Sequence, residues 1–471
     1  MRHRRRLLPA VIGVLCLVTI AAGLTVVRLL PGRLTLWRPP AVAARGLAGT
    51  SPVLGPATGA DDAGGASVAG VSQALAPVLS SPAFGPSLGV LVTNLTTGQV
   101  LYARDADSGF TPASTNKLAT AVAALKVLGP AARLTTKVVT GAGSGSIVLV
   151  GGGDPTLAAG HPPATDYPQP ATLIQLASQT ARALRERGQR SVQLGYDTSL
   201  YTGPGLGPGW SPSYVTTGDV TTITALEVDQ GRVTQAGAPV DADGGGLRSA
   251  DPAQVAANAF AGYLAADGIS VRGAAQQVTA PGGDSTLASV QSPPLAEMVQ
   301  WMLEESNNVI AEDLARQVAI AAGQPASFTG GAAAVTSVLR GLGVTGELQL
   351  YDGSGLSPED KIAPAALVQL IRLAATSAQL RSVLTGLPVE GFSGTLLAGG
   401  SVFGGVGGAG LGMVRAKTGN LTNVVALAGS TYAQNGQVLA FAVMADQVPS
   451  EGSAATQMVD LAGVLAGCGC Q

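Results

Sequence analysis

Three short segments of the chain contain residue types that together could carry out acyl transfer through a serine nucleophile. They are Ser114-Thr115-Asn116-Lys117, Ser306-Asn307-Asn308 and Lys417-Thr418-Gly419. A serine hydroxyl is a weak nucleophile at its own pKa and needs a base within hydrogen-bond reach. Residues three apart on a helix are neighbours on one face, so Lys117 is placed to take the proton of Ser114. The spacing therefore predicts Ser114 as a nucleophile and Lys117 as its base.

A lysine can act as a base only in its neutral form. Burial and a nearby positive charge both favour that form, and Lys417 could supply the charge. Backbone N–H groups at the start of the helix that follows Ser114 would lie near a developing oxyanion. Taken alone, Ser114 and Lys117 also fit a helix cap and a surface lysine. The catalytic hypothesis therefore depends on the other two motifs.

The second motif, Ser306-Asn307-Asn308, lies between two helical patterns at 294–304 and 309–322. A short loop between helices can direct polar side chains into a cleft. We expect Ser306 to relay a proton to a leaving amine and Asn308 to hold a substrate amide. The alternative interpretation is a helix cap, because Ser and Asn are both preferred at that position.

The third motif precedes a predicted hairpin, so we expect it on a strand at a sheet edge, where a substrate can dock by strand addition. Lys417 and Thr418 are suited to binding a terminal carboxylate. Gly419 removes a side chain where the backbone of a ligand must approach. The backbone N–H of Asn420 is a candidate second donor to an oxyanion.

Histidine is scarce, and this limits the alternative mechanisms. The chain has two histidines, His3 and His161. Only His161 could serve a Ser-His-Asp triad, but its Gly- and Pro-rich surroundings indicate an exposed loop. A zinc hydrolase that uses two or more histidines is excluded by the same count. The sequence predicts neither a metal nor another cofactor.

Composition bounds the class of protein. The chain has 471 residues, of which 46% are apolar and 12% are charged, so it can bury a large core and form two or three domains. Its net charge is −2, and no long basic run lies in the body of the chain. Nucleic-acid binding is therefore not expected.

The N-terminus is typical of an exported or anchored protein. Four arginines precede an apolar run of 21 residues, from Leu7 to Val27. About 20 apolar residues span a bilayer. We expect residues 1–30 to be a membrane anchor or signal, with an uncleaved anchor favoured over a cleaved one. This places the protein in the cell envelope, on the extracytoplasmic face of a bacterial membrane. Residues 31–70, rich in Pro, Gly and Ala, are expected to be a disordered linker.

Alternating and helical patterns indicate an α+β fold. Apolar runs at 89–93 and 99–103 predict a hairpin, and runs at 424–430 and 438–444 flank Asn435-Gly436, a strong hairpin signal. Helices are predicted at 118–128, 294–304, 309–322, 330–342 and 364–375. We therefore expect an antiparallel sheet covered by helices, built from residues 71–134 and 286–471. Residues 135–285, with short strand-like runs and one clear helix at 171–188, predict an inserted, mostly-β domain.

Two cysteines, Cys468 and Cys470, stand near the C-terminus. They could form a tight disulfide ring, or they could be free thiols on a frayed tail. The sequence leaves both possibilities open.

With these segments in view, the chain resembles the low-molecular-mass class C penicillin-binding proteins over about residues 75–465. The resemblance rests on four segments, at 112–118, 151–157, 352–357 and 415–421. It implies a β-lactamase/transpeptidase-like domain interrupted between the first two motifs. It also implies a serine D-alanyl-D-alanine carboxypeptidase, often also an endopeptidase. Such an enzyme acts on peptidoglycan stem peptides and is acylated by β-lactam antibiotics.

The chain departs from the family pattern in two respects. Asn420 stands where Thr or Ser is more usual, and Ser-Pro-Glu-Asp follows Leu356. The first two motifs are 306 − 114 = 192 positions apart, which suggests one inserted domain and a reduced third. For the segment Asp352-Gly353-Ser354-Gly355 we expect a role in shaping the rim of the cleft. Asp154-Pro155 is expected to form a structural turn.

Two other functions are alternatives to the leading one. A β-lactamase commonly needs a glutamate between the first two motifs to drive deacylation. None of the glutamates there lies in an E-x-x-L-N setting; they are Glu186, Glu227, Glu297, Glu304 and Glu305. A catalytically silent scaffold of the wall is the other alternative, and three intact motifs argue against it.

Overall fold

The computed structural model describes residues 65–234, 247–283, 285–399, 401–404 and 408–470. The predicted anchor or signal at 1–30 and most of the predicted linker lie outside these ranges. Within them, no helix combines the length and the apolar character that a membrane crossing requires.

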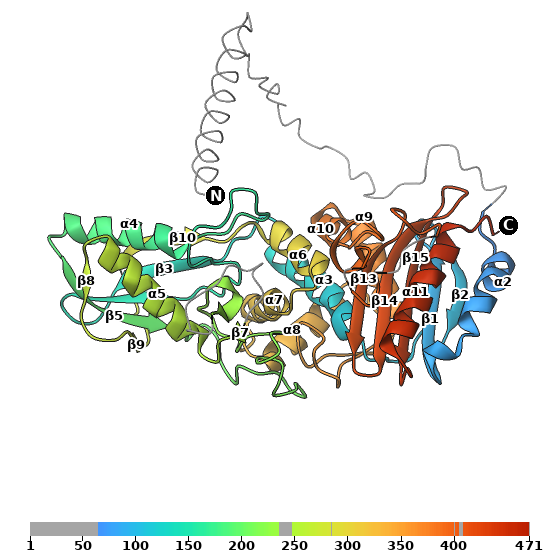
Figure 1. Cartoon of the computed structure of the whole chain (residues 1–471), viewed down its shortest axis with the longest axis horizontal. Helices are drawn as coiled ribbons and strands as arrows, with labels where there is room; N and C mark the ends of the chain where they lie inside the picture. The colour runs from blue at the N-terminus through green and yellow to red at the C-terminus, as the bar shows by residue number, and fades with distance from the viewer. Residues whose placement is uncertain (1–64, 235–246, 284, 400, 405–407, 471) are drawn as a thin grey trace, which may run out of the picture. The chain divides into compact units, whose positions relative to one another are not determined.

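A five-stranded antiparallel sheet joins the two ends of the described chain (Figure 1). Its order is β13-β14-β15-β1-β2, and β13 is an edge strand. Both predicted hairpins are confirmed, and β1 pairs with β15 to connect them. The strands are β1 (Ser87–Asn94), β2 (Val100–Arg104), β13 (Arg415–Leu421), β14 (Val424–Tyr432) and β15 (Val438–Asp446).

Alternate residues of the central strands enter two different cores, because successive side chains of a strand point to opposite faces. Ala442 and Met444 of β15 belong to one cluster of buried residues, whereas Phe441 and Val443 belong to another. Helices α2 (Val68–Leu79) and α11 (Glu451–Ala466) cover the second face. On the first face, α9 (Pro364–Thr376) packs against the sheet. The same core is completed by α3 (Lys117–Leu128), α6 (Leu295–Glu304), α7 (Asn308–Ala321), α8 (Phe328–Gly341) and α10 (Arg381–Thr385).

Helix α3 lies at the centre of the first core. Its residues from Lys117 to Leu125 are all buried, as its lack of a polar face predicts. The predicted helices before and after the second motif and the two that follow are confirmed as α6, α7, α8 and α9. Helix α3 therefore provides a rigid base for the residues at its N-terminus.

The predicted linker extends too far toward the folded part. Ser67 caps α2, with its side chain accepting a hydrogen bond from the Gly70 backbone N–H at 2.9 Å. Ala66 is buried in the second core. Residues 66–70 are therefore part of the fold, because a capping serine and an apolar helix outweigh their small-residue composition.

A second sheet forms between the first and second motifs, and it is mixed. Its order is β10-β3-β4-β5-β8, with β9 also paired to β5. The strands are β3 (Thr135–Thr140), β4 (Ser146–Val150), β5 (Ser191–Asp197), β8 (Ser270–Val271), β9 (Gln276–Gln277) and β10 (Thr286–Gln291). Short pairs are made by β6 (Arg232–Val233) with β7 (Leu247–Arg248), and by β11 (Leu348–Gln349) with β12 (Lys361–Ile362).

Two helices share a core with this second sheet. Helix α4 (Leu173–Glu186) confirms the predicted one. Helix α5 (Pro252–Ala266) was not predicted, because its alanine-rich sequence shows little amphipathic contrast. Strand β10 extends the sheet to Gln291, beyond the predicted limit of the insert at residue 285. The division into domains stays a prediction.

The C-terminal tail is packed rather than frayed. Cys468 and Cys470 form a disulfide, and the Ser67 backbone N–H donates to the Cys470 carbonyl at 2.7 Å. Cys468 is buried in the second core. The tail thus closes against the start of α2.

Candidate active site

The first motif lies in a tight turn at the N-terminus of α3. Ser114 belongs to a 3-10 turn over Ala113–Asn116, which runs directly into the helix. Ala113 has a φ of +46°, in the left-handed region that non-glycine residues rarely adopt. Such strain persists only where surrounding contacts enforce it, and it is common at functional sites. The turn presents Ser114 at the positive end of the helix dipole.

Lys117 is fully buried and has three oxygen atoms around its Nζ. They are Ser114 Oγ at 2.8 Å, Asn308 Oδ1 at 2.6 Å and the Ser354 carbonyl at 2.8 Å. A neutral amine has two N–H bonds and one lone pair. Asn308 and Ser354 can accept both hydrogens, which leaves the lone pair directed at the hydroxyl of Ser114. The geometry suits proton transfer from Ser114 to Lys117.

Burial also makes the neutral form of Lys117 accessible. The loss of hydration lowers the pKa of Lys117 to about 7, although the negative charges of Asp352 and Glu312 partly oppose this change. A lysine with this pKa is neutral in a large fraction of molecules near pH 7. Lys117 therefore has both the contact with Ser114 and the lowered pKa that a base at this position requires.

The second motif lies in the turn between α6 and α7. Asn307 caps α7, accepting a hydrogen bond from the Ile310 N–H at 3.0 Å, so the capping role belongs to the middle residue. Ser306 has a φ of +57°, a second strained position. Asn308 binds Lys117 through Oδ1 and donates through Nδ2 to the Asp219 carbonyl at 2.9 Å. The hydroxyl of Ser306 makes no hydrogen bond within the described residues, and its relay role stays a prediction.

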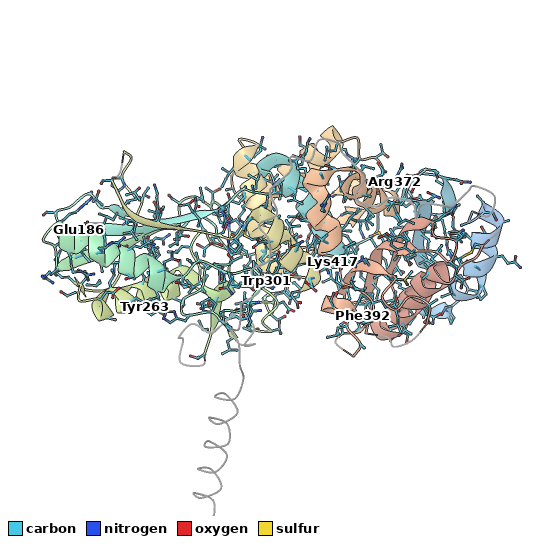
Figure 2. All side chains as sticks on the ribbon, turned by 90° about the horizontal axis from the view of Figure 1, so that it is seen from above. Glu186, Tyr263, Trp301, Arg372, Phe392 and Lys417 are labelled. Atoms are coloured by element: carbon cyan, nitrogen blue, oxygen red, sulfur yellow. A yellow bond between two sulfur atoms is a disulfide. The ribbon has the colours of Figure 1, made fainter. Side chains whose placement is uncertain are left out.

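The third motif lies on edge strand β13, where the sequence analysis expected a substrate to dock. Lys417, labelled in Figure 2, is fully buried, and its Nζ donates to the Thr418 carbonyl at 3.0 Å. Burial, and then the charge of Lys117, lower the pKa of Lys417 well below its usual range. The charge of Lys117 thus favours the neutral form of Lys417, whereas the pKa of Lys117 is lowered by its own burial.

Gly419 brings the first and third motifs into direct contact. A Cβ at this position would lie 2.7 Å from the Pro112 carbonyl and 3.0 Å from the Ser114 backbone nitrogen. No side chain fits there, because the neighbours are backbone atoms of a packed turn. The next residue, Asn420, is exposed. The backbone nitrogens of Ser114 and Asn420 therefore flank the point where β13 meets the turn.

Thr395 is a site residue that the sequence analysis missed. Its hydroxyl lies 2.7 Å from that of Thr418, which is 4% exposed. Thr395 belongs to a short 3-10 turn over Gly394–Leu396, before β13. No local pattern marks it, because only the fold of the 388–414 segment brings it to the third motif.

The expected position of the segment 352–355 at the rim of the cleft is wrong. Asp352 is 2% exposed and Ser354 is fully buried. The Asp352 carboxylate accepts hydrogen bonds from the N–H groups of Gly355 at 2.6 Å and Ser357 at 2.7 Å. These bonds fold the loop inward, so the Ser354 carbonyl contacts Lys117 from within the protein.

His161 and Asp154 lie in the surroundings that the sequence predicts, an exposed position and a structural turn. His161 is exposed. Asp154 is buried, and its Oδ1 accepts hydrogen bonds from the backbone N–H and the hydroxyl of Thr156 at 2.9 and 2.6 Å, as expected of a structural turn. In the described ranges, no group of His, Cys, Asp and Glu side chains is arranged to hold a metal ion.

Comparisons with known proteins agree on the kind of fold and chemistry. The model of the D-Ala-D-Ala carboxypeptidase 3 (S13) family matches residues 71–246 and 237–466. Carboxypeptidase DacB of Mycolicibacterium smegmatis is 39% identical over 85% of each chain. Penicillin binding protein 4 (dacB) from Haemophilus influenzae shares the fold, with a TM-score of 0.66 and 22% identity over 84% of this chain and 97% of that one. A structure of that protein complexed with a β-lactam aligns over the same shares, with a TM-score of 0.60 and 23% identity.

Proposed function

Because the chain belongs to the D-Ala-D-Ala carboxypeptidase 3 (S13) family, we propose that it is a serine D-alanyl-D-alanine carboxypeptidase that forms an acyl-enzyme at Ser114. Its substrates are peptidoglycan stem peptides that end in D-Ala-D-Ala. The observation that carries this proposal is the contact between Ser114 Oγ and Lys117 Nζ, whose two hydrogens are held by Asn308 and Ser354.

In the acylation step, Ser114 Oγ attacks the carbonyl carbon of the penultimate D-Ala while its proton moves to the lone pair of Lys117. The electron pair of the carbonyl bond moves to its oxygen, which the backbone N–H groups of Ser114 and Asn420 stabilise. The C–N bond then breaks, and the departing D-Ala nitrogen takes a proton by way of Lys117 and Ser306. The result is an ester on Ser114 and one free D-Ala.

Deacylation reverses the roles. Water attacks the ester carbonyl and gives a proton to Lys117, and the C–O bond to Ser114 then breaks as Oγ recovers a proton from Lys117. The products are the shortened peptide, with a new carboxylate, and the free enzyme. Lys117 returns to its neutral form, so each turnover consumes only peptide and water.

The terminal carboxylate of the substrate is expected to bind beside Thr418 and Lys417. In the free protein, burial and Lys117 disfavour the charge on Lys417. A bound carboxylate favours the charged form of a neighbouring lysine. Binding of a peptide with a free C-terminus therefore favours protonated Lys417 beside the carboxylate, whereas binding of an amidated peptide does not.

A fluorescent penicillin tests the nucleophile, because a β-lactam ring amide presents a carbonyl to Ser114 and keeps its ring nitrogen attached after opening. We expect covalent labelling of the wild type, none of Ser114→Ala, and normal labelling of Ser108→Ala, an exposed serine six positions earlier. Labelling of Ser114→Ala at the wild-type rate would contradict the assignment.

Digestion of purified muropeptides, read out by mass, tests the reaction itself. A carboxypeptidase releases D-Ala from pentapeptide stems, and an endopeptidase cleaves cross-linked dimers. Rapid loss of the penicillin label with release of opened β-lactam would indicate a β-lactamase instead. A folded wild type that neither labels nor releases D-Ala would indicate a silent scaffold.

For the location of the enzyme, we propose anchoring at the extracytoplasmic face of a bacterial membrane through the N-terminal segment. The apolar run from Leu7 to Val27 and the arginines before it support this. The folded part would then reach peptidoglycan through the residues that follow the run.

A further inference from the structure

The Asp352 carboxylate gathers donors from three separate parts of the chain. Besides the two N–H groups of its own loop, it accepts a hydrogen bond from the indole Nε1 of Trp210 at 2.8 Å. Asn116 Nδ2 lies 3.4 Å from Oδ1 of the carboxylate and 3.1 Å from the Asp352 carbonyl. A buried carboxylate with this many donors fixes the groups around it strongly.

The loop that Asp352 holds is part of the surroundings of Lys117. The Ser354 carbonyl, two residues on, accepts one of the Lys117 hydrogens, and Asn116 directly precedes Lys117. A shift of the Asp352 carboxylate would therefore move an acceptor of the base and the residue next to it. Small displacements of this kind are costly in catalysis.

Trp210 comes from the chain between the first and second motifs, not from the elements that surround α3. It is 9% exposed, and its ring packs edge-to-face against Phe328 of α8, with centroids 5.1 Å apart and an angle of 78° between the planes. Asp219, in the same segment, offers its carbonyl to Nδ2 of Asn308. One segment, 210–219, thus supports both residues that accept hydrogens from Lys117.

The negative charge of Asp352 also acts on Lys117 and raises its pKa. Burial and the Asp352 charge raise the pKa of Asp360 well above its ordinary range. Asp360 accepts from the Tyr351 N–H at 2.6 Å, and Asn116 Nδ2 lies 3.4 Å from its other oxygen. Asp352 has more hydrogen-bond donors than Asp360, and the indole N–H of Trp210 is one of them. The other titratable groups around this pair and Lys117 are Tyr214, Lys417 and Glu312. Glu312 forms an ion pair with Arg316.

We propose that Trp210 and Asp352 are positioning residues for the base: the indole of Trp210 holds the Asp352 carboxylate, and Asp352 holds the loop whose Ser354 carbonyl binds Lys117. The segment between the first two motifs thereby sets the proton affinity and the orientation of Lys117. This inference rests on the proposed function, because Lys117 must be the base of the acylation step.

The rate of labelling by a fluorescent penicillin, measured from pH 5 to 9, tests the proposal. Asp352→Asn removes a negative charge that favours protonated Lys117, so the acid limb of the profile should move to lower pH by about one unit. Trp210→Phe removes one donor and keeps an aromatic ring. Without this donor the carboxylate is held less firmly near the base, and its charge acts less strongly on Lys117. The acid limb should therefore move in the same direction by about half as much, with a several-fold slower plateau.

The double variant separates a specific link from general damage. If Trp210 acts through Asp352, Trp210→Phe should add no further shift in the Asp352→Asn background. Trp301→Phe, at a partly buried tryptophan on α6 (labelled in Figure 2), is the matched control and should keep the wild-type profile. A Trp210→Phe profile identical to the wild type, or shifts that add in full, would overturn the proposal.

Two further outcomes are kept distinct. If Trp210→Phe does not fold, β-(benzothiophen-3-yl)alanine placed at position 210 preserves the bicyclic ring and removes only the N–H donor, and the same shift is expected. If the wild type itself is not labelled, the proposed function fails, whereas a labelled wild type with an unchanged variant refutes only the link through Trp210.

Discussion

At the scale of single residues, the site depends on lysines kept in an unfavourable environment. Lys117 and Lys417 are both fully buried, and the charge of Lys117 disfavours the charge on Lys417. A buried lysine that must be neutral costs stability, because the unfolded chain binds its proton more tightly. The protein therefore gives up folding free energy for a base that works near neutral pH.

Replacing Lys117 should separate activity from stability. The pKa of Lys117 is about 7 in the folded protein and 10.5 for a solvated lysine of the unfolded chain, so the wild type loses stability as pH falls from about 10.5 to 7 and no further below that. Lys117→Met lacks this loss of stability. Its midpoint of urea unfolding should therefore rise relative to that of the wild type as the pH falls from about 10.5 to 7. Release of D-Ala should fall by about 10²–10⁴-fold.

Lys117→Arg is the matched control for charge. Arginine cannot become neutral in a protein, so it retains the cation and loses the base. We expect D-Ala release as low as in Lys117→Met. Release near the wild-type rate in Lys117→Arg would show that a positive charge, and not a base, is needed at this position.

At the scale of elements, three rigid pieces meet at Ser114. Helix α3 presents the first motif, the turn before α7 presents the second, and edge strand β13 presents the third. Their closest approach is at Gly419, where backbone atoms of the turn at Pro112 and Ser114 leave no space for a side chain. These backbone contacts therefore fix the position of β13 relative to the turn.

Gly419→Ala should therefore damage the site more than the loss of one contact would. The added methyl group meets backbone atoms that cannot rotate away, so β13 must shift from the turn. We expect penicillin labelling to fall at least about 100-fold and the free energy of unfolding to fall by about 1–3 kcal/mol. Gly452→Ala on α11, where a Cβ meets nothing within 4 Å, should label normally and gain about 0.5–1 kcal/mol. Equal labelling of both variants would refute the close approach.

At the scale of the whole molecule, the described fold begins near residue 65 and needs both ends of the chain. Strand β1 pairs with β15, and α2 packs with α11 on the same face of the sheet. The Ser67 N–H bonds to the Cys470 carbonyl. All of these contacts join residues after 65, so we expect the catalytic part to fold without the proposed anchor.

A chain that begins at residue 65 should test this separation. We expect it to label with penicillin at the wild-type rate and to remain in the supernatant after membranes are sedimented, whereas the full chain sediments with them. Recovery of the full chain in the supernatant would contradict the anchor. Loss of labelling in the shortened chain would show that the N-terminal segment supports the fold.

Local signals predicted most of the elements that carry the motifs. The Asn435-Gly436 turn and its flanking apolar runs are confirmed by β14 and β15, and the apolar run after Ser114 is confirmed by α3. The boundary at 66–70, helix α5 and the position of the 352–355 loop were not predicted correctly. In each of these cases the outcome depends on what the segment packs against, and composition does not report that.

Residue types and spacing predict the chemistry of the site: a serine with a lysine three residues later, two partner motifs in loop and strand contexts, and too few histidines for another base. Spacing and residue type are enough for this, because they act through local geometry. The atoms that surround Lys117, in contrast, depend on the tertiary fold. Ser354, Trp210 and Thr395 lie 240, 96 and 281 positions from Ser114, and only folding brings them to Lys117, Asp352 and Thr418. The burial of Lys117 in this fold lowers its pKa, a property that no spacing in the sequence can specify.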